Sequence, residues 1–155
     1  MSPSPGSTEP IVVGVDGSPS SLAALQWAGA QARLTGAALQ AVTTWEYPTE
    51  YAGFGFASAI PEDIDFEKDA RDALSAAVAE ALPDQAGLTL TESTLEGHAA
   101  LVLTDLSESA ALLVVGCRGH GGFTGLLLGS VSAHLAAHAH CPVVVVHEHE
   151  HAPDR

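Results

Sequence analysis

A glycine-rich segment near the end of the chain has the residue types best suited to hold an anion. It contains Gly116, Gly119 and Gly129, and Ser130 and Ser132 follow. Glycine lets the backbone approach an anion closely and take positive φ, so successive amides can form an anion-binding site. Ser130 is expected to lie at the start of a helix, where free N–H groups and the helix dipole attract phosphate. The segment therefore predicts a phosphate-binding loop.

The distribution of charged residues along the chain favours an anionic ligand at this loop. Lys plus Arg number 5 against 19 Asp plus Glu, a net charge of −14, yet no Asp or Glu occurs between Ser109 and His147. Arg118 lies in that stretch and is the best candidate for a charged contact with phosphate. The alternative is that a buried strand and an apolar helix simply lack charged residues. The overall acidity argues against nucleic acid or an anionic membrane as a partner, because both need a basic face.

Several classes of protein are excluded by what the sequence lacks. The only lysine is Lys68, and no Gly-Lys-Ser/Thr sequence occurs, so Walker-type nucleotide hydrolases are excluded. No apolar run approaches the roughly 20 residues needed to span a bilayer, and residues 1–10 have no basic residue of a signal peptide. The two cysteines, Cys117 and Cys141, do not make a disulfide framework, which favours a reduced, cytoplasmic setting.

The elements that position the loop alternate along the chain. Apolar runs predict strands at 11–16, 39–45, 88–91, 111–116 and 142–147, and helical spacing predicts helices at 18–35, 66–81, 98–108 and from 128 onward. Residues 46–61 are expected to form a long loop. This alternation predicts an α/β fold of three layers, with a five-stranded parallel sheet between four helices. Ligands of such sheets bind outside the carboxyl ends of the strands, where the strand order reverses.

The length of the chain predicts a single domain. Its 155 residues fall within the roughly 100–200 residues of an ordinary domain, which we assign to 10–147. Residues 1–9 and 148–155 are expected to be disordered tails.

The chain resembles the universal stress proteins, whose ATP-binding members carry Gly-x2-Gly-x9-Gly-Ser/Thr. Gly116, Gly119, Gly129 and Ser130 fit that spacing without a gap. The opening Val-Gly-Val-Asp-Gly-Ser and the closing Cys-Pro-Val-Val-Val-Val also resemble the family. Two departures are Cys117, where serine is common, and Thr43, where histidine is frequent.

The resemblance implies a Rossmann-like sheet of the adenine nucleotide alpha hydrolase-like type, with strand order 3-2-1-4-5. It implies ATP bound across strands one and four, with Mg²⁺ carried on its phosphates. The residues implied to contact the nucleotide are Gly14, Val15, Asp16, Thr44, Gly116, Arg118, Gly119, Gly129, Ser130, Val131 and Ser132. The function implied is that of an ATP-dependent regulatory module. The alternatives are a slow ATP hydrolase and a scaffold that binds no nucleotide.

The last strand predicts a second copy of the chain as partner. In the order 3-2-1-4-5 it lies at a sheet edge, and Val143, Val144, Val145 and Val146 form a continuous apolar run. Such an uncovered edge is an aggregation hazard, so we expect it to pair antiparallel with its copy across a two-fold axis. Family members that bind ATP dimerise in this way. The alternative is a monomer whose tail covers the edge.

Other residues that are able to do chemistry have a simpler interpretation as well. Asp16 can merely cap the turn into the first helix. Cys117 is either redox-active or an inert thiol, and His120 either assists at the loop or is only exposed. His134 and His138 have the spacing of metal ligands, with His140 nearby, but a solvated helix face is the simpler interpretation. The same choice, weak metal binding or disorder, holds for the alternating His and Glu of residues 147–151.

Overall fold

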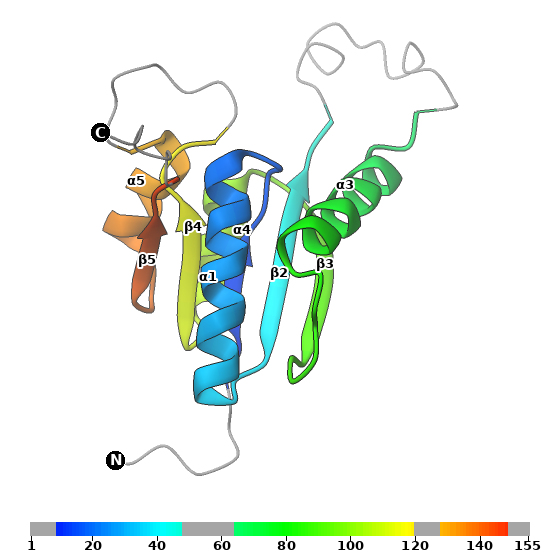
Figure 1. Cartoon of the computed structure of the whole chain (residues 1–155). Helices are drawn as coiled ribbons and strands as arrows, with labels where there is room; N and C mark the ends of the chain where they lie inside the picture. Colours follow the sequence, from blue (N-terminus) through cyan, green and yellow to red (C-terminus); the bar gives the residue numbers. More distant parts are fainter. Residues whose placement is uncertain (1–8, 48–63, 120–127, 149–155) are drawn as a thin grey trace, which may run out of the picture.

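The computed structural model describes residues 9–47, 64–119 and 128–148. In this part of the chain strands and helices alternate, as the sequence predicts (Figure 1). The elements are β1 (Ile11–Gly14), α1 (Pro19–Thr35), β2 (Leu39–Trp45), α3 (Phe66–Ala81), β3 (Leu90–Glu96), α4 (Ala99–Ser107), β4 (Leu112–Gly116), α5 (Ser130–His138) and β5 (Val143–Val146).

The five strands form one sheet in the order β3-β2-β1-β4-β5. Every neighbouring pair is parallel, and β1 lies between β2 and β4. The predicted α/β class, strand order and parallel sheet are therefore confirmed. In a parallel sheet all strands end at the same side, which we call the carboxyl edge, and begin at the opposite side, the amino edge.

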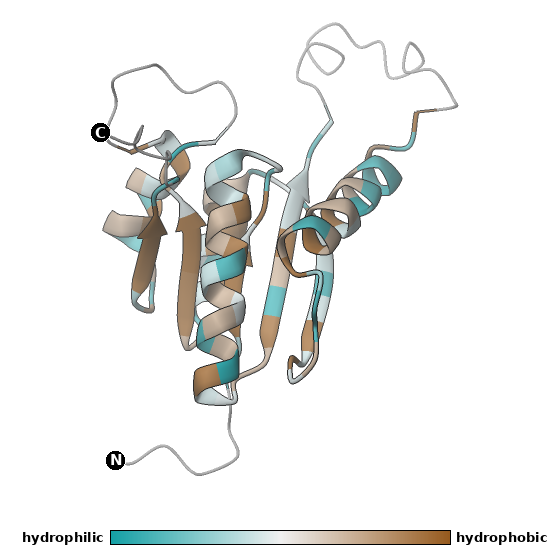
Figure 2. Ribbon diagram, in the orientation of Figure 1, coloured by the Kyte–Doolittle hydropathy of each residue, from teal (hydrophilic) through white to brown (hydrophobic). Residues whose placement is uncertain are grey.

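The core is divided between the two faces of the sheet because successive strand residues point to opposite sides. Ile11 and Val13 of β1 pack in the cluster formed with α1 and α3, whereas Val12 packs in the cluster formed with α4 and α5. The helices of each face contact one another, α1 with α3 and α4 with α5. Figure 2 shows β4 and β5 as nearly continuous hydrophobic strands, as expected where both faces are covered.

Local sequence explains where α1 begins and ends. The Ser18 side chain accepts a hydrogen bond from the Ser21 amide at the N-terminus, and Pro19 occupies the first helical turn. Gly36 ends the helix in the left-handed conformation, with φ of 77°. The helix therefore runs from the carboxyl edge to the amino edge and points its N-terminus at the end of β1.

The largest error in a predicted boundary is in the third strand; smaller ones are the end of β1, at Gly14 and not at 16, and the start of α5, at Ser130 and not at 128. The third strand was expected at 88–91, but β3 covers Leu90–Glu96 and pairs with the whole of β2, from Leu39 to Trp45. At a sheet edge, side chains such as those of Thr91 and Glu92 face solvent, so polar residues do not mark the end of the strand. Gly97, with φ of 136°, follows its last residue.

Three expectations concern residues that the structure mostly leaves undescribed. The tails at 1–9 and 148–155 lie outside the described residues except for one position each, and most of the loop at 46–61 also lies outside them. Among the described residues, no helix is both long and apolar enough to cross a bilayer.

Candidate functional site

A cavity of about 450 Å³ lies at the carboxyl edge, where the chain leaves β1 and β4. This is the point at which the strand order reverses, since β1 leads to β2 on one side and neighbours β4 on the other. All the residues predicted for the site line this cavity. They come from β1 and its following turn (Gly14, Val15, Asp16), from β2 (Thr44), from the end of β4 and its loop (Gly116, Arg118, Gly119), and from the start of α5 (Gly129, Ser130, Val131, Ser132).

Two of the three motif glycines are closely packed. A Cβ on Gly116 would lie 2.7 Å from the backbone carbon of Ser20 and 2.8 Å from the amide nitrogen of Ser21. A Cβ on Gly119 would lie 2.5 Å from Oδ2 of Asp16. The expectation of positive φ is wrong for these glycines, because among the described glycines positive φ occurs elsewhere, at Gly17, Gly36, Gly87 and Gly97. At Gly116, which meets backbone atoms, space and not backbone conformation requires glycine.

The polar end of the cavity is built from the first turn of α5. Gly129 is its N-cap residue and provides no side-chain cap, so the amides of the first turn lack intrahelical acceptors. The Gly129 amide donates to the Cys117 carbonyl at 2.7 Å, which joins this turn to the end of β4. The Ser132 hydroxyl donates to the carbonyls of Cys117 (3.0 Å) and Gly129 (3.1 Å). Ser132 therefore stabilises the loop with its hydroxyl and presents its amide to the cavity.

The charged residues among the described lining residues are Asp16 and Arg118. Asp16 Oδ1 accepts hydrogen bonds from the Ser18 amide at 2.9 Å and from the Ser18 hydroxyl. The simpler interpretation of Asp16 as a turn cap is thus correct, and Asp16 lines the cavity as well. Arg118 is exposed and lines the cavity, and its backbone lies beside Gly129, the N-cap residue of α5.

Another part of the cavity lining is apolar. Its walls include Val15, Val42, Leu103 and Val115, which are buried. The Thr43 hydroxyl donates to the Val15 carbonyl at 2.8 Å and holds the ends of β1 and β2 together. The cavity is therefore suited to a ligand that has both an apolar part and an anionic part.

Several lining residues are not evident from the sequence. Gly17, Ser18 and Ser21 belong to the turn before α1, where the helix-capping pattern was the only signal. Ala73 of α3 and Ala99 of α4 reach the cavity from helices on opposite faces of the sheet. Nothing in their helical spacing separates them from ordinary core residues.

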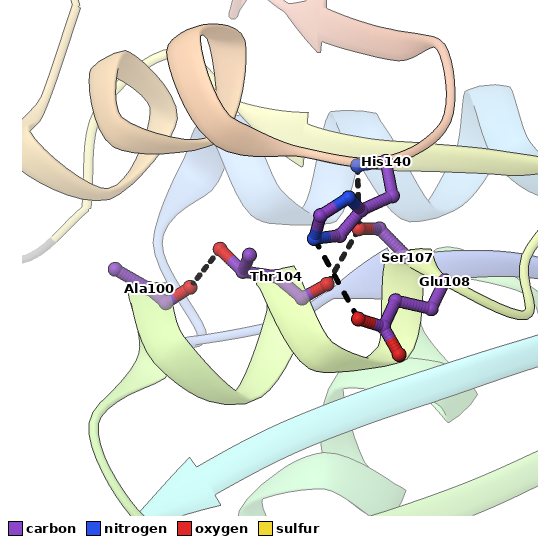
Figure 3. Close-up of polar contacts among 5 residues, drawn as sticks. All are labelled: Ala100, Thr104, Ser107, Glu108 and His140. Atoms are coloured by element: carbon purple, nitrogen blue, oxygen red, sulfur yellow. Dashed lines mark hydrogen bonds and ion pairs between the residues drawn. The ribbon is translucent and has the colours of Figure 1, made fainter.

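The remaining candidate residues do not assemble into a second site within the described residues. The rings of His134 and His138 have centroids 4.6 Å apart, but the described residues contain no group of three or more possible metal ligands. His140 Nε2 lies 3.7 Å from Oε1 of Glu108, at the amino edge (Figure 3). Cys117 is buried, and His120 and residues 149–151 lie outside the described part.

Comparison with known proteins places these features in a family. The sequence profile of the universal stress protein family matches residues 7–147. A universal stress protein of Mycobacterium tuberculosis (strain H37Rv) is 37% identical over 90% of this chain and 48% of its own length. The chain spans about half the length of the curated relatives that it matches.

Solved structures agree with the fold. The crystal structure of a universal stress protein in complex with cAMP is 31% identical, with a TM-score of 0.58, over 91% of this chain and 98% of that one. Universal stress protein UspA from Lactobacillus plantarum is 22% identical, with a TM-score of 0.71, over 90% of this chain and 97% of that one.

Proposed function

Since this chain belongs to the universal stress protein family, we propose that its cavity binds an adenine nucleotide, with ATP as the ligand. The observation that carries the proposal is the pairing of an apolar wall with the open amides of α5 and the Arg118 side chain in one cavity. A nucleotide has the same two parts, a flat base and a chain of phosphates. The complex of a related universal stress protein with cAMP supports this ligand class.

The residues of the cavity suggest where each part of the nucleotide binds. The base fits the apolar end, beside Thr44, and the phosphates fit the amides at Gly129 to Ser132 together with Arg118. Residues 116–119 and 128–132 contribute no carboxylate, and the one carboxylate among the described lining residues is that of Asp16, so we propose that Mg²⁺ would enter on the phosphates. When bound, Mg²⁺ neutralises part of the phosphate charge that a single arginine leaves uncompensated.

We further propose that the nucleotide regulates a homodimer. β5 is a sheet edge, as the dimer requires. The carbonyls of Pro142 and Val146 accept hydrogen bonds from the Leu113 and Cys117 amides of β4. Backbone groups of a strand alternate in direction, so those of Val143 and Val145 face away from β4 and are placed to pair with a second copy.

Nucleotide binding is tested first by identifying what the protein carries. The purified protein is heat-extracted, the released nucleotide is identified, and binding of ATP, AMP and cAMP is measured by calorimetry. Released ATP supports a regulatory module, whereas released ADP with continuing phosphate production indicates slow hydrolysis. No released nucleotide and no calorimetric binding would leave the scaffold alternative and overturn the proposal.

A substitution at Gly129 tests the location of the site. In Gly129→Val the new side chain projects beside the Arg118 backbone, since even a Cβ would lie 3.3 Å from its Cα, and narrows the phosphate end. We expect loss of at least about 100-fold in ATP affinity with a folded protein, because several charge-assisted hydrogen bonds are lost. Ala137→Val, at the exposed far end of α5, adds the same type of side chain and is the control. Retained affinity in Gly129→Val would contradict the assignment of the loop.

The dimer is tested by removing one outward-facing donor. Val145→Pro deletes an amide that faces away from β4, and proline is tolerated on an edge strand at such a position. We expect the variant to sediment as a monomer while its circular dichroism remains that of the parent. A wild-type protein that sediments as a monomer, or a variant that stays dimeric, would contradict pairing through β5.

A further inference from the structure

We propose that Ser20 is a positioning residue for the nucleotide site: its hydroxyl holds the backbone of Arg118 from outside the cavity. This inference rests on the proposed nucleotide binding. Ser20 does not line the cavity, and it is 4% exposed in the first turn of α1. It therefore has no direct access to a ligand.

The Ser20 hydroxyl is hydrogen-bonded to the carbonyl and the amide of Arg118. It donates to the Arg118 carbonyl at 2.5 Å and accepts from the Arg118 amide at 3.5 Å. The Ser18 hydroxyl, whose one proton is donated chiefly to Oδ1 of Asp16, makes a longer secondary contact of 3.3 Å with the same carbonyl. The N-terminus of α1 thus holds the loop after β4 at the residue that brings positive charge to the cavity.

The contact depends on how closely α1 approaches the end of β4. Gly116, two residues before Arg118, has its Cα against the backbone of Ser20 and Ser21, so that no side chain fits between the helix and the strand. This approach brings a short serine side chain within reach of the Arg118 backbone. Glycine at position 116 therefore also serves to place Ser20 beside the Arg118 backbone.

The consequence for binding follows from preorganisation. With its carbonyl and amide held, the Arg118 backbone is fixed before a ligand arrives. The Gly119 amide is fixed with it, because it belongs to the same planar peptide group as the Arg118 carbonyl. Without the Ser20 hydroxyl, the Arg118 carbonyl keeps only the longer contact from Ser18, and ligand binding must order the loop. Removal of the Ser20 hydroxyl is therefore expected to weaken the contacts to the phosphates and to leave the contacts to the base unchanged.

A second buried serine provides a matched control. Ser107 is 1% exposed and also joins separate elements, because its hydroxyl donates to the Thr104 carbonyl at 2.5 Å and accepts from the His140 amide at 2.9 Å (Figure 3). It lies at the amino edge and does not line the cavity. Ser20→Ala and Ser107→Ala therefore remove the same kind of bond at opposite edges of the sheet.

The experiment compares affinities for ATP and for adenosine in the full chain, well below the melting temperature. Loss of one hydrogen bond predicts ATP binding weakened about 3- to 10-fold in Ser20→Ala, with adenosine changed less than about 2-fold. Ser107→Ala is expected to lower the melting temperature similarly and to change neither affinity. Combined with Arg118→Ala, the effect of Ser20→Ala on ATP should be smaller than in the wild-type background, because part of that effect acts through the Arg118 side chain.

The outcomes separate this inference from the proposed function. If wild-type protein binds ATP and Ser20→Ala binds it equally well, the positioning role is wrong and nucleotide binding stands. If Ser20→Ala weakens ATP and adenosine by the same factor, Ser20 is merely structural and the inference fails. If wild-type protein binds no nucleotide, the proposed function fails first.

Discussion

The carboxyl edge and the amino edge have similar serine hydrogen bonds but different surroundings. At the carboxyl edge Ser20 joins α1 to the loop after β4, and at the amino edge Ser107 joins α4 to the segment before β5. The first bond borders a cavity, whereas the described cavity lining includes nothing from the second. The cause is the parallel arrangement, which points helix N-termini with their open amides toward the carboxyl edge and helix C-termini toward the amino edge. Equal hydrogen bonding is therefore expected to affect ligand binding only at the carboxyl edge, where helix amides are left open.

Glycines at the carboxyl edge and at the amino edge differ in how closely neighbouring atoms pack against them. Gly36 and Gly87, at the amino edge, have φ of 77° and 79°, and a Cβ on either would meet nothing within 4 Å. Gly116 and Gly119, at the carboxyl edge, lack positive φ but have no room for a Cβ. Positive φ also occurs at the carboxyl edge, at Gly17 and Gly97, so glycine allows tight turns at both edges and close approach of neighbouring segments at the carboxyl edge.

Within this comparison of the two edges, the largest expected effect is on ATP binding and distinguishes Arg118 from Arg33. Arg118→Ala removes the positive charge at the cavity and should weaken ATP binding about 10- to 100-fold, the range for a hydrogen bond to a charged group. Its stability should change little, because the side chain is exposed. Calorimetric titration with ATP measures the first effect, and thermal unfolding measures the second.

Arg33 is the matched arginine of the amino edge. Its guanidinium donates to the carbonyls of Ala86, at 3.2 Å, and Asp84, which joins the end of α1 to the segment before β3. Arg33→Ala should lower the free energy of unfolding by about 0.5–1 kcal/mol and leave ATP affinity unchanged. If Arg33→Ala weakened ATP binding as much as Arg118→Ala, the division of roles between the edges would be wrong.

Much of the fold followed from local patterns. Alternation of apolar runs and helical spacing predicts the layers, and the Ser18-Pro19 pair and Gly36 predict both ends of α1. The strand order came from resemblance to a family, because the local pattern does not say which strands become neighbours. The length of β3 could not be predicted, since an edge strand tolerates the polar residues that elsewhere mark a loop.

The cavity was predictable only in part. Residues of the spaced glycine motif and of the β1 end were found because their types and positions are distinctive. Ser20, Ala73 and Ala99 were missed because their roles depend on segments that are distant in the sequence; Ser20 and Arg118 are 98 positions apart. The role of Gly116 was assigned to the ligand, whereas its close contact is with α1.

The smallest effect that we expect concerns the two cysteines, which also lie at opposite edges. Cys141 precedes β5 at the amino edge; burial and, to a lesser degree, the charge of Glu9 raise the pKa of its thiol. The thiolate is the reactive form, so alkylation of Cys141 by iodoacetamide should be slow at neutral pH and should accelerate at a higher pH than for a free thiol. Cys117, 4% exposed at the carboxyl edge, should react only when the protein unfolds.

The raised pKa of Cys141 also sets the sign of a small pH dependence of stability. Between the ordinary thiol pKa and the raised value, the folded protein holds a proton on Cys141 that the unfolded chain has lost. This contribution to stability is complete below the ordinary thiol pKa and is lost as pH rises through the raised value. Cys141→Ser should flatten that part of the unfolding profile, and Cys117→Ser provides the comparison at the carboxyl edge. Faster alkylation of Cys117 than of Cys141 in the folded protein would show that the carboxyl edge opens more readily than its packing implies.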